Sequence, residues 1–334
     1  MYRKLATLFL CLTVLTLGPV MIAQAAPQHI LKFAGTYAPD HPGSIAQQAI
    51  ADEVFEATKG ELKIEVFPGG QLGDYTQIYE DVMRGNIDMG WLYITGQYNT
   101  ALEISSLPYL TTSWEGLKKI FSPGSYFYQA YEKAHADCDV KLLALYVDGF
   151  VNMVMVKEPV EPMSPTADHK VKLRIPPTDA FKVTMDSLNW DTVTINWADV
   201  YTAMQTGVCD GYIGSSAVLV YYTFRDLTKF YYEMRAYSET LSYVINQDTW
   251  AKLSPEHQKA IYDACQRQAA KSIETAANNE KTYQQKMADE YGVKIVIPSQ
   301  EEIDRLADYI RQNVWPKFEK AYGQDLIQGL LSNL

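Results

Sequence analysis

Residues 171–211 read VKLRIPPTDAFKVTMDSLNWDTVTINWADVYTAMQTGVCDG, and strand and helix patterns alternate along this stretch. Apolar residues alternate at its start, at Val171, Leu173 and Ile175, which predicts a strand because successive side chains of a strand face opposite ways. Further strands are predicted at 193–195 and 208–213, and helical spacing is found at 179–188 and 197–206. This order predicts parallel strands with helices packed on their faces.

A lone cation, Arg174, stands within the first of these predicted strands, and two prolines follow the strand. One interpretation is a structural ion pair that joins two elements. The other is an anion clamp at the carboxyl end of a strand, where α/β sheets bind their ligands. A guanidinium suits that role because its planar donors match a carboxylate bidentately and its charge persists at any relevant pH. Composition alone leaves the two interpretations close to even.

The same alternation extends along most of the chain. Before residue 171, strands are predicted at 29–34, 62–67, 87–93, 140–147 and 150–156. Helices are predicted at 45–58, 75–84 and 113–136, the last with an interruption at Pro123-Gly124. After residue 211 come a strand at 241–246, a long helix at 249–287 with a helix start at Ser254-Pro255, a strand at 293–297 and helices over 299–322. We expect an α/β fold with two sheets, between which the chain passes more than once, and therefore a cleft with a hinge.

The first 25 residues have the features of a secretory signal peptide. Arg3 and Lys4 precede a largely apolar stretch at 5–22, and Ala23-Gln24-Ala25 fits an A-x-A cleavage site. A retained membrane anchor is the alternative, but the Gly18-Pro19 break argues against it. We expect cleavage near Ala25 and export to the periplasm. Removal of two cations and no acids changes the formal net charge from −11 to −13, and about 309 residues remain, enough for two lobes.

Several classes of function are disfavoured by composition and motifs. An acidic chain without a basic stripe is not expected to bind nucleic acid. Three cysteines follow the signal peptide, Cys138, Cys209 and Cys265; their spacing matches no zinc site, and whether two of them form a disulfide is left open. The histidines are scattered, and neither a G-x-S-x-G motif nor a phosphate-binding loop is present. We therefore expect no enzyme, cofactor or metal site.

Four stretches resemble the solute-binding proteins of tripartite ATP-independent periplasmic (TRAP) transporters. They are VFPGGQLGDYTQIYEDVMRGNIDMG at 66–90, SSLPYL at 105–110, KLRIPP at 172–177 paired with WADVYTAMQTGVCDG at 197–211, and INQDTWAKLSPEHQKAI at 245–261. The resemblance covers nearly the whole mature chain. It implies a two-lobed fold like that of periplasmic binding proteins (type II-like), with hinge strands and a long helix that spans the hinge. The implied lobes are 26–148 with about 237–275, and 149–236 with about 276–334.

The resemblance also implies a function. A protein of this family captures a small organic carboxylate between its lobes and delivers it to the membrane permease of a TRAP-type secondary transporter. The arginine of the family's K-x-R strand pairs with the ligand carboxylate, which implies that Arg174 is the clamp. Two alternatives are a periplasmic input module of a sensor and, with less support because no catalytic constellation is found, an enzyme on the same scaffold.

Departures from the family pattern narrow the expected ligand. Many relatives carry a second arginine where this chain has Val151, and some keto-acid binders place a metal-binding carboxylate where it has Ile213. A dicarboxylate, a keto acid or a metal-bridged ligand is therefore disfavoured. We expect a monocarboxylate with an apolar or aromatic tail. We also expect that half of the aromatic residues proposed to bind it belong to the core. The candidate ligand-binding residues are Arg174, Asn152, Phe150, Tyr37, Trp91, Tyr93, Trp197, Tyr212, Gly214 and Ser215.

Overall fold

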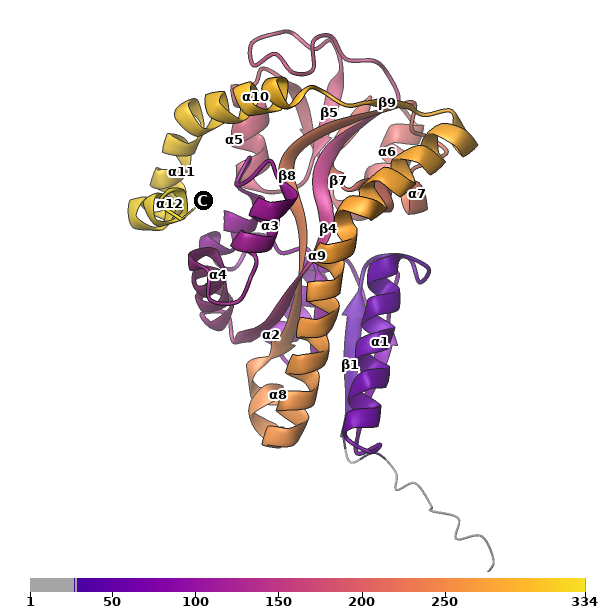
Figure 1. The fold of residues 1–334 in the computed structure, drawn as a ribbon, viewed down its shortest axis with the longest axis vertical. Coiled ribbons are helices and arrows are strands. Elements are labelled where there is room, and N and C mark those ends of the chain that lie inside the picture. Colours follow the sequence, from indigo (N-terminus) through magenta and orange to yellow (C-terminus); the bar gives the residue numbers. More distant parts are fainter. Residues whose placement is uncertain (1–26, 28, 334) are drawn as a thin grey trace, which may run out of the picture.

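The computed structural model describes residue 27 and residues 29–333, so the predicted signal peptide lies outside the described residues. Within them, nine strands form one sheet in the order β2-β1-β3-β8-β4-β7-β5-β6, and β9 pairs with β8 (Figure 1). The strands are β1 (His29–Gly35), β2 (Leu62–Phe67), β3 (Met89–Leu92), β4 (Val140–Met155), β5 (Lys172–Ile175), β6 (Asp191–Thr194), β7 (Gly211–Ser215), β8 (Phe230–Asn246) and β9 (Lys294–Val296).

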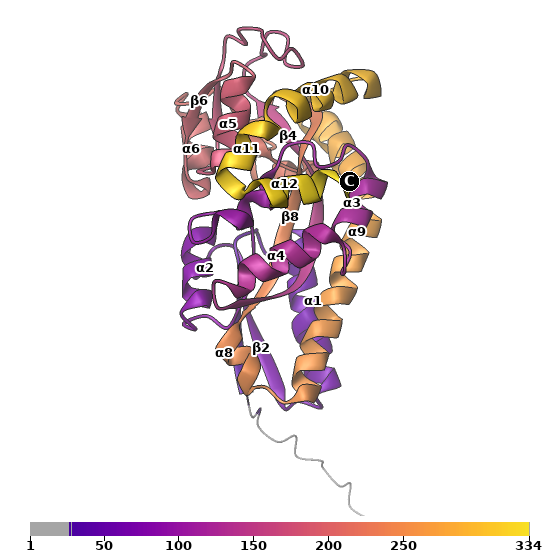
Figure 2. The same ribbon diagram turned by 90° about the vertical axis from the view of Figure 1, so that its left-hand side faces the viewer.

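Helices cover both faces of this sheet (Figure 2). The N-terminal half contains α1 (Pro42–Ala57), α2 (Tyr75–Met83), η1 (Thr100–Ser106), α3 (Trp114–Ile120) and α4 (Tyr126–Ala136). The rest of the chain contains α5 (Asp179–Ser187), η2 (Trp197–Asp199), α6 (Val200–Gln205), α7 (Ala217–Thr223), α8 (Gln247–Lys252), α9 (Pro255–Tyr291), α10 (Gln300–Asn313), α11 (Trp315–Tyr322) and α12 (Gln324–Leu331). Of these, η1, α7 and α12 are not predicted from the sequence.

The parallel order predicted for residues 171–211 is confirmed. Strand β5 pairs in parallel with both β6 and β7, and β1 pairs in parallel with both β2 and β3. Strands β4 and β8 pair antiparallel with each other, β8 continues to β3, and β4 continues to β7. The fold is thus of the α/β class with parallel strands at both ends of the sheet.

Two sequence predictions about the middle of the sheet are wrong. The strands predicted at 140–147 and 150–156 form one 16-residue strand, β4, and the strand predicted at 241–246 is the end of the 17-residue β8. The Asp148-Gly149 pair lies at a register shift within β4, where Gly149 has a φ of 149°, so it forms a bulge and no turn. Because β4 and β8 run through the whole molecule, the two expected sheets are one, and the lobe boundaries remain predictions.

Both faces of β4 are buried, which explains its nearly continuous apolar sequence. Leu142 and Leu145 pack with α2, α3, α4 and the C-terminal helices, whereas Leu143 and Tyr146 pack with α1 and α9. The 37-residue α9 lies against β4, α1 and α7 and extends along most of the molecule's length (Figure 1). It begins separately from α8 because Ser254 caps its first turn and Pro255 occupies its first position.

The three cysteines raised by the sequence, Cys138, Cys209 and Cys265, are buried free thiols in the structure. Burial raises the pKa of each thiol, so all three are held in the neutral form. In the part of the chain that the structure describes, no helix is both long and apolar enough to cross a membrane.

Candidate functional site

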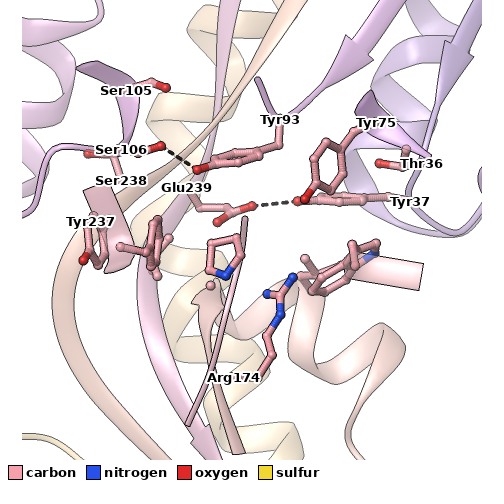
Figure 3. A pocket seen from close by; sticks show the side chains of 16 residues that line it. Thr36, Tyr37, Tyr75, Tyr93, Ser105, Ser106, Arg174, Tyr237, Ser238 and Glu239 are labelled. Atoms are coloured by element: carbon pink, nitrogen blue, oxygen red, sulfur yellow. Dashed lines mark hydrogen bonds between the residues drawn. The ribbon is translucent and has the colours of Figure 1, made fainter. Parts of the chain in front are cut away.

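A cavity lies near the ends of β1, β3, β5 and β7, beside the middle of β4 and β8 (Figure 3). It comprises about 530 Å³ of space not filled by atoms, part of which is open to solvent. Sixteen residues line it: Thr36, Tyr37, Tyr75, Tyr93, Ser105, Ser106, Val151, Arg174, Pro176, Phe181, Trp197, Gly214, Leu219, Tyr237, Ser238 and Glu239.

Arg174 is the one cationic side chain in this lining. It is 2% exposed, its Nε donates a hydrogen bond to the Ile195 carbonyl oxygen at 2.8 Å, and its Nη2 has no hydrogen-bond partner. Burial lowers the pKa of the guanidinium, which means that burial disfavours its charge. Figure 3 shows the guanidinium pointing toward Glu239 and Tyr37.

A structural ion pair does not account for Arg174. Among the described residues, no acidic side chain forms an ion pair with it, and its Cζ lies over the Trp197 ring, 5.9 Å from the ring centroid. A buried cation without an anionic partner is costly. The geometry therefore favours the second interpretation, in which the donors of Arg174 face a cavity that an anion can enter.

Gly214 allows the backbone of β7 to lie close to Arg174. Its φ is 145°, a value that residues with side chains rarely adopt, and a Cβ at this position would be 3.5 Å from Arg174 Nη1. A side chain here would therefore strain the backbone and occupy the space in front of the guanidinium.

Glu239 is the one acidic side chain in the lining, and the sequence analysis did not identify it. It is 4% exposed and comes from β8, and its Oε1 accepts a hydrogen bond from the Tyr37 hydroxyl at 2.7 Å. Burial, with a smaller contribution from the negative charge of Asp148, raises the pKa of Glu239 to about 8. The Tyr37 hydrogen bond and the charge of Arg174 act in the opposite direction without cancelling this effect.

Hydroxyl groups form the upper wall of the cavity in Figure 3. Tyr93 and Ser106 share a hydrogen bond through their hydroxyls, and Ser105 and Ser106 end η1. These serines belong to the SSLPYL stretch that carries part of the family resemblance, so that stretch contained a signal for the site that the candidate list did not use. Ser238 and Tyr237 come from β8, whose start the sequence did not reveal.

Five of the ten candidate residues line the cavity: Arg174, Tyr37, Tyr93, Trp197 and Gly214. The other five do not. Phe150 and Asn152 flank Val151 on β4, and because alternate residues of a strand face opposite ways, the two point away from the cavity that Val151 lines. Ser215 is likewise the neighbour of Gly214 on β7.

Asn152 and Phe150 are buried and contact other residues of the protein interior. The Asn152 amide donates to the Tyr231 hydroxyl and to Glu280, and its Oδ1 accepts from the Arg235 backbone. Phe150 packs against Trp114, with ring centroids 4.8 Å apart. Asn152 thus joins the long strands to α9, and Phe150 packs β4 against α3.

Trp91 and Tyr212 are fully buried core residues. The Trp91 ring packs edge-on against Tyr37 and Tyr146, at centroid distances of 5.2 Å in both cases. The Tyr212 ring lies 4.7 Å from that of Phe224 and 6.1 Å from that of the lining residue Trp197. Each supports a residue of the cavity without lining it. In residues 27 and 29–333, no group of three or more His, Cys, Asp or Glu side chains could hold a metal ion.

A buried cavity at strand ends with an unpaired arginine defines a class of protein that binds a small anion. Residues 33–321 match the bacterial extracellular solute-binding proteins, family 7, and the chain belongs to this family. The resemblance to TRAP solute-binding proteins is thereby confirmed.

Individual relatives agree with this assignment. The C4-dicarboxylate-binding protein DctB of Bacillus subtilis is 25% identical over 91% of this chain and 86% of its own length. The 2,3-diketo-L-gulonate-binding periplasmic protein YiaO of Escherichia coli is 26% identical over 86% of both chains. A TRAP periplasmic solute-binding protein of Haemophilus influenzae, crystallised with bound L-gulonate, has the same two-lobed fold, with a TM-score of 0.80, 21% identity and coverage of 92% of this chain and 100% of that one.

Proposed function

We propose that this protein captures a small organic carboxylate in the periplasm and delivers it unchanged to the membrane permease of a TRAP-type transporter. The observation that carries this proposal is the buried guanidinium of Arg174, which faces a cavity, lacks an acidic partner and keeps Nη2 unbonded. The names of the relatives support it, since they describe binding of a C4-dicarboxylate, a diketo-gulonate and L-gulonate, all of which are organic acids.

The free energy of binding would come mainly from the state of Arg174 before the ligand arrives. Its charge is buried, and among the described residues no acidic side chain forms an ion pair with it. A ligand carboxylate supplies the missing charge and accepts hydrogen bonds from the N–H groups, which point outward in the plane of the guanidinium. The Nε–H···O bond to Ile195 fixes the guanidinium in place, so little rotational freedom is lost on binding.

The lining supports a monocarboxylate with an apolar or aromatic tail. Val151, which stands where many relatives have a second arginine, lines the cavity and adds no charge. Phe181, Leu219 and Tyr237 provide apolar surface on which such a tail could pack. A second carboxylate would find no second cation among the lining residues and would share the cavity with Glu239.

A thermal-shift screen of the mature protein, purified from the periplasm, tests this proposal. The panel should contain monocarboxylates, dicarboxylates and sugar acids, each beside its uncharged amide. We expect at least one monocarboxylate to raise Tm, by the mass-action effect of a ligand that binds only the folded state, and its amide to have no effect. Failure of every carboxylate to raise Tm would contradict the proposal.

A further inference from the structure

The proposed function uses Arg174 and leaves Glu239 without a role. The two side chains are the one cation and the one acid of the cavity lining, they come from β5 and β8, and no ion pair joins them within the described residues (Figure 3). Tyr37 is the one hydrogen-bond partner of the Glu239 carboxyl among the described residues. A buried carboxyl with a single partner is costly, so its presence in a binding cavity calls for a function.

Charged and titratable groups reach Glu239 from several elements. Asp148 of β4 adds negative charge near Glu239. Its own partners are Ser216, whose hydroxyl donates to Oδ2, and His41, whose Nε2 lies 3.6 Å from Oδ2. The groups that interact electrostatically with Glu239 are Tyr37, Asp148, Arg174, Tyr75, Tyr93 and Tyr212. Arg174 is the one cation among them.

Aromatic rings surround the space between the two charged side chains. Six of the lining residues are aromatic: Tyr37, Tyr75, Tyr93, Phe181, Trp197 and Tyr237. The negative faces of such rings attract cations, and a cavity of aromatic walls with a carboxyl group is a setting in which organic ammonium ions are bound. The Tyr93 and Ser106 hydroxyls add oxygens that can accept hydrogen bonds from an N–H group.

We propose that Glu239 is the second anchor of the ligand, and that the cavity selects a zwitterion whose carboxylate binds Arg174 and whose cationic nitrogen binds Glu239. This inference rests on the proposed function, because it assumes that Arg174 holds the carboxylate. It defines the ligand class as amino acids and related ammonium carboxylates. An apolar or aromatic side chain of such a ligand would pack on Phe181, Leu219 and Tyr237.

Proton balance gives the proposal a distinctive signature. With a pKa raised to about 8, Glu239 is mostly protonated at neutral pH in the empty cavity. An ammonium ligand binds the carboxylate form, so Glu239 loses its proton to the solvent as the ligand enters. Affinity for a zwitterion should therefore rise roughly tenfold per pH unit below about pH 8 and then level off. A carboxylate with an uncharged tail should show the opposite trend, because ionised Glu239 repels it.

Matched ligand pairs test the proposal by calorimetry at about pH 6 and pH 8. Two of the pairs are ω-amino acids of about two to six carbons with their ω-hydroxy counterparts, and L-phenylalanine with 3-phenyllactate. The third is glycine betaine with 3,3-dimethylbutanoate, which has the shape of glycine betaine but a neutral carbon in place of the cationic nitrogen. We expect at least one ammonium ligand to bind about tenfold or more tightly than its uncharged partner, with affinity that increases with pH and with proton release.

The variants are Glu239→Gln and, as a control at a partly exposed position of β2 outside the cavity lining, Glu65→Gln. Glu239→Gln should remove the preference for the ammonium ligand and the pH dependence, while Glu65→Gln should keep both. Two results with the wild-type protein would each overturn the proposal without any variant. One is tighter binding of the uncharged partner, and the other is an affinity for the ammonium ligand that falls as pH rises. If uncharged carboxylates bind in an Arg174-dependent way, the proposed function survives either result; if neither series binds, both proposals are contradicted.

Discussion

Arg174 carries a cost in the empty protein that a ligand would offset. Its guanidinium is 2% exposed with an unbonded Nη2, and burial lowers its pKa. Replacement by methionine, which has a similar length and no charge, should therefore raise the free energy of unfolding of the ligand-free protein, by about 1 kcal/mol or more. Urea unfolding of both proteins measures this. A large loss of stability in Arg174→Met would show that the arginine is structural.

Glu239 should make the stability of the ligand-free protein depend on pH. Its pKa is raised from 4.5 to about 8, so the folded state keeps a proton that the unfolded state has released. The contribution is fully present below about pH 4.5 and is lost as pH rises through about 8. We expect the free energy of unfolding of the wild-type protein, measured in urea at several pH values, to fall as pH rises through this window. The fall should be less steep in Glu239→Gln. Identical slopes would contradict the assignment of this pKa.

Single residues of the site differ in how far the sequence reveals them. Arg174 could be predicted, because a cation in an alternating apolar strand is conspicuous and the K-x-R resemblance names its role. Phe150 and Asn152 were assigned to the cavity wrongly, because the register shift at Val147/Gly149 decides which residues of β4 face it, and no sequence pattern reports a bulge. Glu239 has no signal in the sequence, since it lies in β8, which was predicted to start at residue 241 and starts at Phe230.

At the scale of elements, Glu103 of η1 holds the N-terminus of α5. Its Oε1 accepts from the Asp179 backbone N–H at 3.4 Å, and its Oε2 accepts from that of Ala180 at 3.2 Å and from the Tyr322 hydroxyl at 2.6 Å. Thr178, the N-cap residue, makes no side-chain capping bond of its own. One buried carboxylate thus joins η1, α5 and α11 through the free N–H groups of a helix start.

Replacement of Glu103 by glutamine keeps its shape but removes its charge and one acceptor. We expect the free energy of unfolding to fall by about 1–2 kcal/mol, the usual cost of a lost helix cap. Glu256→Gln is the matched control, because Glu256 is an exposed acid in the first turn of α9 and should change stability by about 0.5 kcal/mol or less. Equal effects of the two substitutions would exclude the capping role.

Local sequence patterns predict some helices and strands of this fold and fail for others. Apart from η1, α7 and α12, the helices and the parallel strands were predicted within a few residues, because their periodicity and caps are local. The continuous strands β4 and β8 were divided, because Asp148-Gly149 is typical of a turn and becomes a bulge only through pairing with a distant strand. The split into α8 and α9 did follow from Ser254-Pro255, a local signal.

In the whole molecule, the side chains that would hold the ligand lie deep in the protein. Arg174, Tyr237 and Glu239 are 2%, 2% and 4% exposed, so we expect the surrounding elements to move when a ligand enters. The two-lobed fold suggests closure by rotation about β4 and β8.

Small-angle scattering should therefore give a larger radius of gyration for the ligand-free protein than the structure implies, and a decrease when a bound carboxylate is added. The Arg174→Ala variant, which should not bind, is the control and should show no decrease. Identical scattering of the wild-type protein with and without a ligand known to bind would contradict closure.

The dissociation constant of a carboxylate from the thermal-shift screen, measured by calorimetry for three variants, tests the role of Arg174 most directly. Arg174→Ala should weaken binding by about 100-fold or more, as expected when one partner of a buried charge pair is removed. Arg174→Lys should also weaken it, because a point charge cannot replace the planar fork. Arg267→Ala, at an exposed arginine paired with Glu53, should bind as the wild type does. Wild-type affinity in a correctly folded Arg174→Ala protein would contradict the account.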